Sequence, residues 1–439
     1  ARWCSHDVST PPRTARGTRR ALGNPAHPPA PQRLTLTHPF CVVHHHHHHH
    51  HYGAQVQHND DREVSRSLIS RCEWLRPPSL HVVHIASEMA PIAKVGGLAD
   101  VVTSLAKAHQ CTGTLVEVIV PKYDCIHYNE VKELRQMAEI QVPWGPPGTT
   151  VRTVVWCGLA EGLPVFFIEP HSSERFFWRK SFYGEPDDSV RFSFFSRAAL
   201  EFLARRSHRA PDVIHAHDWQ AAAVVPLLKE TYRPSALSRT KAVLTIHNMA
   251  FQGFISASYL QHMGVSTRYQ HFTHHDVMLH APAHDAHSQP TLSLLKGGIV
   301  YADKVTTVSP TYGREVLTPE YGMGLQHVLQ RHSYKFAGVL NGIDHETWDP
   351  ATDALIPAHF CADDVPGKEA CKKALLKELG LPYAEPGADG CGGRPLLAVV
   401  SRLTEQKGLH LISAGVRAAM KMGAQVVVLG SAPVPAVQA

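Results

Sequence analysis

Short apolar runs rich in β-branched residues recur along the chain from His81 onward, and stretches of helical periodicity separate them. Parallel strands need a crossover connection, usually a helix, so this alternation predicts βαβ units and mostly parallel sheets. One exception is a hairpin, expected where two runs are joined across residues 161–164. We expect strands at 81–87, 115–120, 151–156, 165–168, 212–216, 242–247, 304–309, 337–340, 396–401 and 426–429, and helices at 98–107, 190–205 and 408–422.

The composition is that of a soluble protein with more than one domain. A length of 439 residues predicts two or more domains, and 44% hydrophobic residues are enough for real cores. The net charge of +5 is too small to argue for a nucleic-acid or membrane surface. Nine cysteines without a Cys-x-x-Cys pair favour reduced thiols in a non-secreted protein over a disulfide framework or a zinc site.

Residues 1–79 have the composition of a disordered, low-complexity segment. Residues 1–59 contain six arginines, no lysine, one acid and seven prolines, so they cannot bury enough apolar surface to offset their ordering entropy. Such a stretch also suits a transit segment or a linker, and because the chain begins with Ala1 rather than Met, we expect residues to precede it. We interpret the histidine run His44–His51 as low complexity rather than as a metal site or a tag, and assign it no function.

A glycine turn follows the first strand, in the sequence Lys94-Val95-Gly96-Gly97-Leu98. Open α/β sheets bind ligands at the carboxyl ends of their strands, against helix N-termini. Glycines there let an anion approach the backbone N–H groups, and the ammonium of Lys94 adds a positive charge. An ordinary tight turn before a helix is the structural alternative.

Two neighbouring strands end in histidine-rich clusters. His215 and His217 share one face of a strand, and Asp218 and Trp219 begin the turn that follows. A carboxylate beside an imidazole can fix its tautomer, and an indole can wall a sugar-sized site; alternatively, Asp218 is a helix N-cap beside a packed Trp219. A similar strand end occurs at residues 245–248.

The third cluster pairs two cations. Arg402 closes an apolar strand, and Lys407 lies just before Gly408 and a helix. Together they can hold a diphosphate, Arg402 through its planar fork and Lys407 as a point charge. Such a pair would stabilise a leaving nucleotide as negative charge develops on it. Two solvated loop charges are the alternative.

A further histidine-rich stretch lies at residues 271–287, but it has no regular metal-ligand spacing. We therefore expect a solvated loop there rather than a metal site.

Taken together, these clusters resemble those of the starch and glycogen synthases, the glycosyltransferase family 5 enzymes. The sequences at residues 176–179 and 193–201 are most similar to class IV plant or algal starch synthases. The resemblance implies an α/β fold of the GT-B type, with two Rossmann-like domains of which the second is incomplete. The implied boundaries are a disordered segment at 1–79, an acceptor-side catalytic domain at 80–340 and the start of a C-terminal glycosyltransferase domain at 341–439. The matching segments are Lys94–Leu98, Pro121–Asp124, Phe182–Gly184, Asp187, Arg191–Phe192, His215–Trp219, His247–Asn248, Thr307–Tyr312, Leu340–Asp344, Ser401–Gly408 and Leu429–Pro433.

The resemblance implies transfer of glucose from ADP-glucose to the non-reducing end of an α-1,4-glucan, with retention and without a metal or other cofactor. It also implies a chloroplast or plastid location, with starch granule-initiation proteins as partners. The residue roles that it implies are donor binding by Lys94, Gly96 and Gly97, contact with the transferred glucose by His217 with Asp187, Tyr183 and Asn248 nearby, and neutralisation of the ADP leaving group by Arg402 and Lys407.

The sequence departs from the family pattern near its C-terminus. The family's glutamate motif beside the reacting sugar and its Gly-Thr-Gly-Gly loop do not occur after Gly430, and only two strands and one helix are expected after Asn341. Parallel strands normally need helices on both faces, so we expect a fragment or truncated gene product with little synthase activity. The alternatives are a non-catalytic glucan-binding or assembly protein made from the acceptor half, and a GT-B transferase that uses UDP-glucose.

Overall fold

The computed structural model describes residues 80–206, 210–265, 291–385 and 393–430. The expectations for residues 1–79, the histidine-rich stretch at 271–287 and the segment after Gly430 lie outside the described residues. The chain divides into two compact units, one of residues 57–344 and the other of residues 1–56 with 345–439. No helix among the described residues is both long and apolar enough to cross a membrane.

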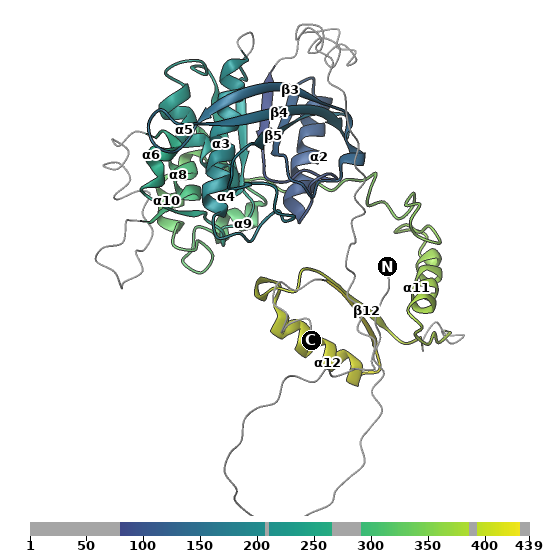
Figure 1. Ribbon diagram of the computed structural model, residues 1–439. Coiled ribbons are helices and arrows are strands. Elements are labelled where there is room, and N and C mark those ends of the chain that lie inside the picture. The colour runs from purple at the N-terminus through teal and green to yellow at the C-terminus, as the bar shows by residue number, and fades with distance from the viewer. Residues whose placement is uncertain (1–79, 207–209, 266–290, 386–392, 431–439) are drawn as a thin grey trace, which may run out of the picture. The chain divides into compact units, whose positions relative to one another are not determined.

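The larger unit is built on one nine-stranded sheet, with the order β11-β10-β7-β6-β1-β2-β5-β4-β3. Figure 1 labels its strands β3, β4 and β5. The six strands from β11 to β2 are parallel, as is the β2–β5 pair, whereas β5, β4 and β3 run antiparallel to one another. The bounds are β1 His81–Ile85, β2 Leu115–Pro121, β3 Lys132–Pro143, β4 Thr150–Ala160, β5 Leu163–Pro170, β6 Val213–His217, β7 Lys241–Ile246, β10 Lys304–Thr307 and β11 Phe336–Gly338; β8 Phe254–Ser256 and β9 Thr291–Ser293 form a separate antiparallel pair.

Each strand expected in this unit is present, and β4 and β5 form the expected hairpin. Strand β3 was not predicted. Half of its twelve residues are charged or polar, only Ile140 and Val142 are buried, and its pairing with β4 has two irregularities. Charges and bulges are typical of an edge strand, where they hinder pairing with other chains, and they hide the apolar pattern.

Helices cover both faces of the sheet. His84 of β1 lies beside His109 at the end of α2, whereas Phe166 of β5, in register with Ile85 through β2, packs on Phe202 of α3. The bounds of the α-helices in this unit are α2 Gly97–Cys111, α3 Asp188–Arg205, α4 Asp218–Ala222, α5 Val224–Leu227, α6 Tyr259–Met263, α8 Leu294–Tyr301, α9 Pro310–Glu315 and α10 Gln326–Arg331; shorter turns are η1 Tyr128–Glu130, the π-helical η2 Leu228–Tyr232 and η3 Ser333–Lys335.

Helix α3 buries four phenylalanine rings in the core of this unit. Phe192, Phe194, Phe195 and Phe202 on it are at most 2% exposed, and burial of each ring contributes on the order of 1.5–3 kcal/mol. The helix begins with Asp188 in its first turn and ends with Arg205 in its last, as the helix dipole favours. It therefore anchors the loop that precedes it, residues 176–187, against the sheet.

The smaller unit contains the expected strands β12 Leu396–Val400 and β13 Gln425–Leu429, paired in parallel, and the expected helix α12 Leu409–Lys421. The expectation of only one helix was wrong, because α11 Pro366–Glu378 and the short η4 Glu405–Lys407 also form. Apolar side chains remain open here: Val400 is 70% and Leu411 is 67% exposed.

Candidate active site

The backbone of the glycine turn is hydrogen-bonded to the carboxylate of Glu88, a residue that we did not predict. Glu88 follows β1, and its Oε2 accepts hydrogen bonds from the backbone N–H groups of Val95, at 2.7 Å, and Gly96, at 3.0 Å. These two N–H groups were expected to face a ligand, so the structure differs from that expectation. Lys94 lies on the same turn and pairs with Asp100 in the first turn of α2, with 2.7 Å between Nζ and Oδ1.

Both glycines of this turn lie in open space. A Cβ atom added at Gly96 or at Gly97 would have no heavy-atom neighbour within 4 Å. The turn therefore has no packing requirement for glycine at these positions, whereas a ligand that approaches the backbone closely would require it. Gly97 is also the first residue of α2, where the positive end of the helix dipole favours an anion.

Tyr183 joins the loop before α3 to this turn. Its hydroxyl lies 2.6 Å from Oε1 of Glu88 and 2.8 Å from Oγ of Ser87. Burial, with the neighbouring charge of Glu88, raises the pKa of Tyr183 well above its ordinary value, so the phenol keeps its proton and donates to the carboxylate. Glu88 is thus shared between Tyr183 and the glycine turn.

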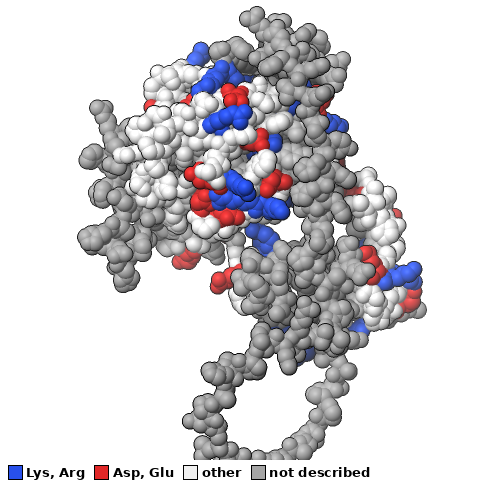
Figure 2. Space-filling model, in the orientation of Figure 1, with Lys and Arg blue, Asp and Glu red and all other residues white. Residues whose placement is uncertain are grey.

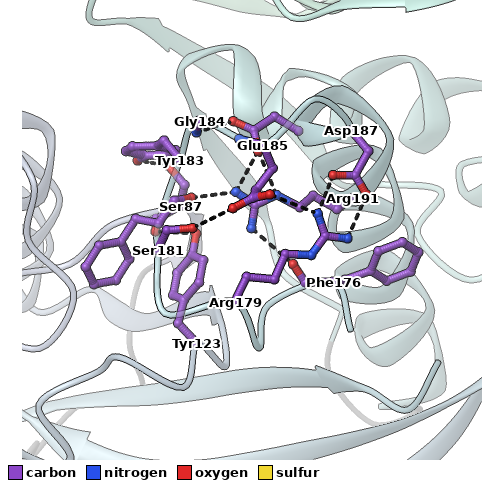
Figure 3. Close-up of polar contacts among 12 residues, drawn as sticks. Ser87, Tyr123, Phe176, Arg179, Ser181, Tyr183, Gly184, Glu185, Asp187 and Arg191 are labelled. Atoms are coloured by element: carbon purple, nitrogen blue, oxygen red, sulfur yellow. Dashed lines mark hydrogen bonds and ion pairs between the residues drawn. The ribbon is translucent and has the colours of Figure 1, made fainter. Parts of the chain in front are cut away.

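Asp187 is engaged by an arginine of its own loop. Arg179 donates to it from both terminal guanidinium nitrogens, Nη1 and Nη2, and this hydrogen bonding lowers the pKa of the Asp187 carboxyl (Figure 3). Arg191, which is fully buried, donates to the backbone carbonyls of Phe176 and Phe182 and binds Asp188. Two arginines therefore hold this loop, and Asp187 is part of that framework.

His217 is fully buried, and both of its ring nitrogens face other histidines. Nε2 lies 2.9 Å from Nδ1 of His84 on β1, and Nδ1 lies 3.1 Å from Nε2 of His247 at the end of β7. His215 shares the same face of β6, as predicted, and its Nε2 lies 2.6 Å from Oγ1 of Thr245. A sugar contact by the ring of His217 would require one of these hydrogen bonds to break.

Asp218 combines an unusual backbone conformation with an unusual acidity. Its φ of 60° lies in the left-handed region, which residues other than glycine seldom adopt and which clusters at functional sites. Burial raises the pKa of its carboxyl to about 7, and Glu88 adds to this effect. Its Oδ1 accepts from the backbone N–H groups of His247, at 3.3 Å, and Asn248, at 3.4 Å.

The structure thus brings most of the predicted residues of the larger unit together at the carboxyl ends of the parallel strands. The Glu88 cluster holds Gly96 and Tyr183, and the Asp218 cluster holds Asn248 and the histidines, while the charges of Glu88 and Asp218 influence each other. Strands β1, β6 and β7, whose carboxyl ends meet here, supply the positions.

Three of the histidines also form a set with metal-ligand spacing. Ligand atoms of His84, His215 and His217 lie within 4.8 Å of one another, and all three residues are buried. However, His84 and His217 use facing nitrogens for a mutual hydrogen bond, and His215 faces Thr245. The rings of His215 and His217 are also stacked, 21° from parallel, whereas lone pairs that bind one ion must converge.

Arg402 and Lys407 lie in the smaller unit, where the sequence placed them. Arg402 follows β12, and Lys407 ends the short turn η4, immediately before Gly408 and α12. Both residues are exposed, and Gly408 has a φ of 74°, a conformation that suits glycine. Their approach to the residues of the larger unit stays a prediction.

The visible face of the molecule carries mixed charge. Figure 2 shows Lys and Arg side chains beside Asp and Glu side chains on the described part of that face. This mixture agrees with the small net charge of +5.

Sequence reasoning missed three residues of this site, Glu88, His84 and Asp100. Glu88 is an acid close after a buried strand, and that position could have marked it. His84 was hidden inside an apolar run, because its role depends on the pairing of β1 with β6.

Comparison with known proteins agrees with this geometry. A family model described as the starch synthase catalytic domain matches residues 81–331. Probable starch synthase 4, chloroplastic/amyloplastic, of Arabidopsis thaliana is 45% identical over 385 residues, which are 87% of this chain and 35% of that protein, so the chain spans about a third of this relative. A glycogen synthase of Protochlamydia amoebophila is 41% identical over 367 residues, which are 82% of this chain and 70% of that protein.

A solved structure is also similar. The catalytic domain of starch synthase IV from Arabidopsis thaliana, bound to ADP and acarbose, matches with a TM-score of 0.74 and 48% identity, over 82% of this chain and 70% of that one. The α/β fold prediction and the family resemblance are therefore confirmed. The chain belongs to the starch synthase catalytic domain family, the glycosyltransferase family 5 hexosyltransferases that include starch and glycogen synthases.

Proposed function

We propose that this chain carries the acceptor-side half of a glucosyltransferase that moves glucose from ADP-glucose to the non-reducing end of an α-1,4-glucan, with retention and without a metal cofactor. The observation that carries the proposal is the coincidence of the family match, at residues 81–331, with the cluster of Glu88, Tyr183, Asp218 and the glycine turn at one sheet edge. The related starch synthase IV domain was solved with ADP and acarbose, which supports a nucleotide donor and a glucan acceptor.

In this proposal the donor phosphates lie against Gly97 and the N-terminus of α2, where a Cβ-free backbone and a helix dipole favour an anion. Lys94 supplies a charge from the same turn. Arg402 and Lys407 neutralise the ADP leaving group, as two cations can without a metal ion.

The acceptor and the transferred glucose lie near Tyr183, Asn248 and Asp218. Asp218 is protonated over part of the neutral range, because burial raises the pKa of its carboxyl to about 7. The protonated Asp218 can therefore donate a hydrogen bond to a sugar oxygen, which a charged carboxylate cannot do. The phenol proton of Tyr183 is donated to Glu88, so its oxygen is left to accept from a sugar hydroxyl. Asp187 keeps the loop that carries Tyr183 in place through Arg179.

We also propose that the 439-residue polypeptide alone transfers glucose slowly. The described part of the smaller unit leaves Val400, Leu411 and Val428 exposed, at 70%, 67% and 43%. A donor-binding unit with open apolar faces would hold Arg402 and Lys407 loosely, and transition-state stabilisation depends on exact placement.

The test measures incorporation of labelled glucose from ADP-glucose into glycogen, with UDP-glucose in parallel. We expect slow incorporation from ADP-glucose, retention in the product, and binding of ADP that Lys94→Gln weakens. Lys107→Gln is the matched control, because Lys107 is also an exposed lysine of this unit paired with an acid, Glu161. Turnover equal to that of a whole synthase would contradict the slow-transfer proposal, and binding unaffected by Lys94→Gln would contradict the assigned phosphate position.

A second candidate is a non-catalytic glucan-binding or assembly protein. The extensively buried larger unit and the open smaller unit favour it. Pull-down on insoluble glucan, without measurable affinity for ADP, would favour this function over the transferase.

A plastid location and granule-initiation partners belong to the same proposal. The location is supported by the Arabidopsis relative, whose name includes chloroplastic/amyloplastic. Imaging a fluorescent fusion in a plant or algal cell tests the location, and signal outside plastids would contradict it.

A further inference from the structure

We propose that His109, His84, His217 and His247 form one hydrogen-bonded imidazole chain, in which His109 and His84 are positioning residues that set the tautomer of His247 at the candidate site. The inference deepens the proposed function, because it gives this site a defined hydrogen-bonding partner for sugar hydroxyls.

The contacts run without a gap from the end of α2 to the end of β7. Nδ1 of His109 lies 3.4 Å from Nε2 of His84, whose Nδ1 lies 2.9 Å from Nε2 of His217. Nδ1 of His217 then lies 3.1 Å from Nε2 of His247. In every link, a Nδ1 atom faces a Nε2 atom.

The fold creates this chain through strand register. His84 of β1 is paired with His215 of β6, so these two side chains share a face of the sheet, and His217 lies two residues further on the same face. Helix α2 covers that face and brings His109 from its last turn. The row of four imidazoles therefore depends on four elements, α2, β1, β6 and the end of β7, that only the folded sheet brings together.

Burial keeps the imidazoles neutral. Burial lowers the pKa of His84 and His217 well below the ordinary value and that of His247 to about 4, and it also lowers the pKa of His109. A neutral imidazole has one donor nitrogen and one acceptor nitrogen. Each internal member must then donate to one neighbour and accept from the other.

Only two arrangements satisfy all three links. Either all four residues carry their proton on Nδ1 and donate toward His247, or all four carry it on Nε2 and donate toward His109. A single residue with the other tautomer would place two donors or two lone pairs face to face, and a buried unsatisfied polar group is costly. The tautomers are therefore coupled along the chain.

The coupling matters at the His247 end. His247 is partly exposed, and its backbone N–H is bound to Asp218 beside Asn248. In the first arrangement its Nδ1 is a donor, and in the second it is an acceptor. His109 lies at the opposite end of the row of imidazoles and is also partly exposed. Because its second ring nitrogen can meet other groups, the surroundings of His109 bias which of the two arrangements forms.

The experiment uses the full chain labelled with ¹⁵N-histidine at pH 7.5, since long-range ¹⁵N–¹H correlations distinguish the Nδ1–H and Nε2–H tautomers. Each of the four residues is assigned by its own His→Gln variant. We expect all four to show the same tautomer in the unsubstituted chain. Mixed or opposite tautomers among them would overturn the proposal.

Substitutions at His84 test the coupling by geometry. An asparagine amide lies near the Nδ1 position and keeps the link to His217, a glutamine amide lies near Nε2 and keeps the link to His109, and leucine keeps neither. We expect His84→Asn to retain a single tautomer at His217 and His247, and His84→Gln and His84→Leu to give averaged signals there. Unchanged signals in His84→Leu would contradict the coupling.

Variants at His109 keep the test valid if the buried His84 variants do not fold, because His109 is only partly buried. We expect His109→Leu to shift the His247 signal and to weaken maltooligosaccharide binding about five-fold, the size of one hydrogen bond, while His109→Asn, whose amide lies near the Nδ1 position, restores both. His171→Gln, at an exposed position, is the control and should change neither. Uniform, coupled tautomers without any glucan binding would refute the proposed function, but they would leave the hydrogen-bonded row of imidazoles in place.

Discussion

Glycines at this site differ sharply in what surrounds them. Gly253 has a φ of 63°, and an added Cβ atom would overlap Cε3 of Trp219, whereas the space around Gly97 is open. Trp219 in turn packs edge-on against Phe192 of α3. The indole that we expected to wall a sugar site is therefore a buried residue, 8% exposed, whose ring is held by backbone contact with Gly253.

Replacing Gly253 with alanine should be strongly destabilising. Both the left-handed backbone and the overlap with Trp219 oppose a methyl group, so we expect a loss of about 2–4 kcal/mol in the free energy of unfolding. Gly97→Ala should change that free energy by less than about 0.5 kcal/mol. Urea denaturation followed by tryptophan fluorescence measures both, and equal losses in the two variants would show that the packing at Gly253 is not the cause.

Asp218→Asn should stabilise the folded chain in alkaline solution. The pKa of about 7 in the folded state lies above the ordinary aspartate value of 3.8, so the folded state holds a proton that the unfolded state releases. Stability contributed by Asp218 therefore falls as the pH rises from about 4 to about 7, by about 1.4 kcal/mol per unit. Asparagine keeps the acceptor for the N–H groups of His247 and Asn248 without this titration.

Unfolding midpoints of the unsubstituted chain and Asp218→Asn, measured at pH 5 and pH 8, test this expectation. The difference between the two proteins should be larger at pH 8. A difference that does not change with pH would show that Asp218 is ionised when folded.

At the scale of elements, strands β1 and β6 place their histidines on one buried face. Burial lowers the pKa of His215 to about 3 and that of His247 to about 4, and lowers those of His84 and His217 well below 6.5. Between these values and 6.5 the unfolded state binds more protons than the folded one. The stability that neutral burial provides is thus complete above pH 6.5 and is lost as the pH falls below it.

We therefore expect the free energy of unfolding to decrease between pH 6.5 and pH 5 by about 1.4 kcal/mol per unit for each buried histidine. Over this pH range the stability contributed by Asp218 increases as the pH falls, so it offsets the contribution of one histidine. Denaturation curves at half-unit intervals measure the slope. His215→Asn should reduce this slope by the contribution of one histidine, about 1.4 kcal/mol per pH unit. The exposed His171→Asn is the control and should leave the slope unchanged. An identical slope in both variants would contradict the assignment.

The elements show which parts of the fold a sequence reveals. Strands with buried apolar residues, such as β2 and β6, were predicted because their pattern is local. The edge strand β3 and the helix α11 were not, because a partly exposed element needs no apolar run, and in α11 only Leu376 is buried. The glycine turn was predicted from local spacing, whereas its partner Glu88 and the neighbour pair His84–His215 depend on contacts that only the folded sheet creates.

At the scale of the molecule, the larger unit should fold without the smaller one. Its sheet, both helical layers and the site residues from Lys94 to Asn248 all lie within residues 57–344. We expect residues 80–344, expressed alone, to unfold cooperatively and to retain the coupled histidine tautomers. Circular dichroism with urea titration measures this, and a gradual transition would show that the smaller unit is needed.

The smaller unit should behave differently on its own. With Val400 and Leu411 exposed in its described part, residues 345–439 should bind a hydrophobic dye and associate with one another. Light scattering and dye fluorescence measure these properties. A monomeric fragment that does not bind the dye would contradict the expectation and would weaken the case for slow transfer by the whole chain.

The carboxylate of Glu88 has one more consequence. Because it already fastens the backbone of Val95 and Gly96, the loop around Lys94 keeps its shape before any nucleotide arrives. The conformational entropy of this loop is then lost when the protein folds and not when a nucleotide binds. Glu88→Gln, which donates where the carboxylate only accepts, should make nucleotide capture slower while leaving the other end of the sheet unaltered.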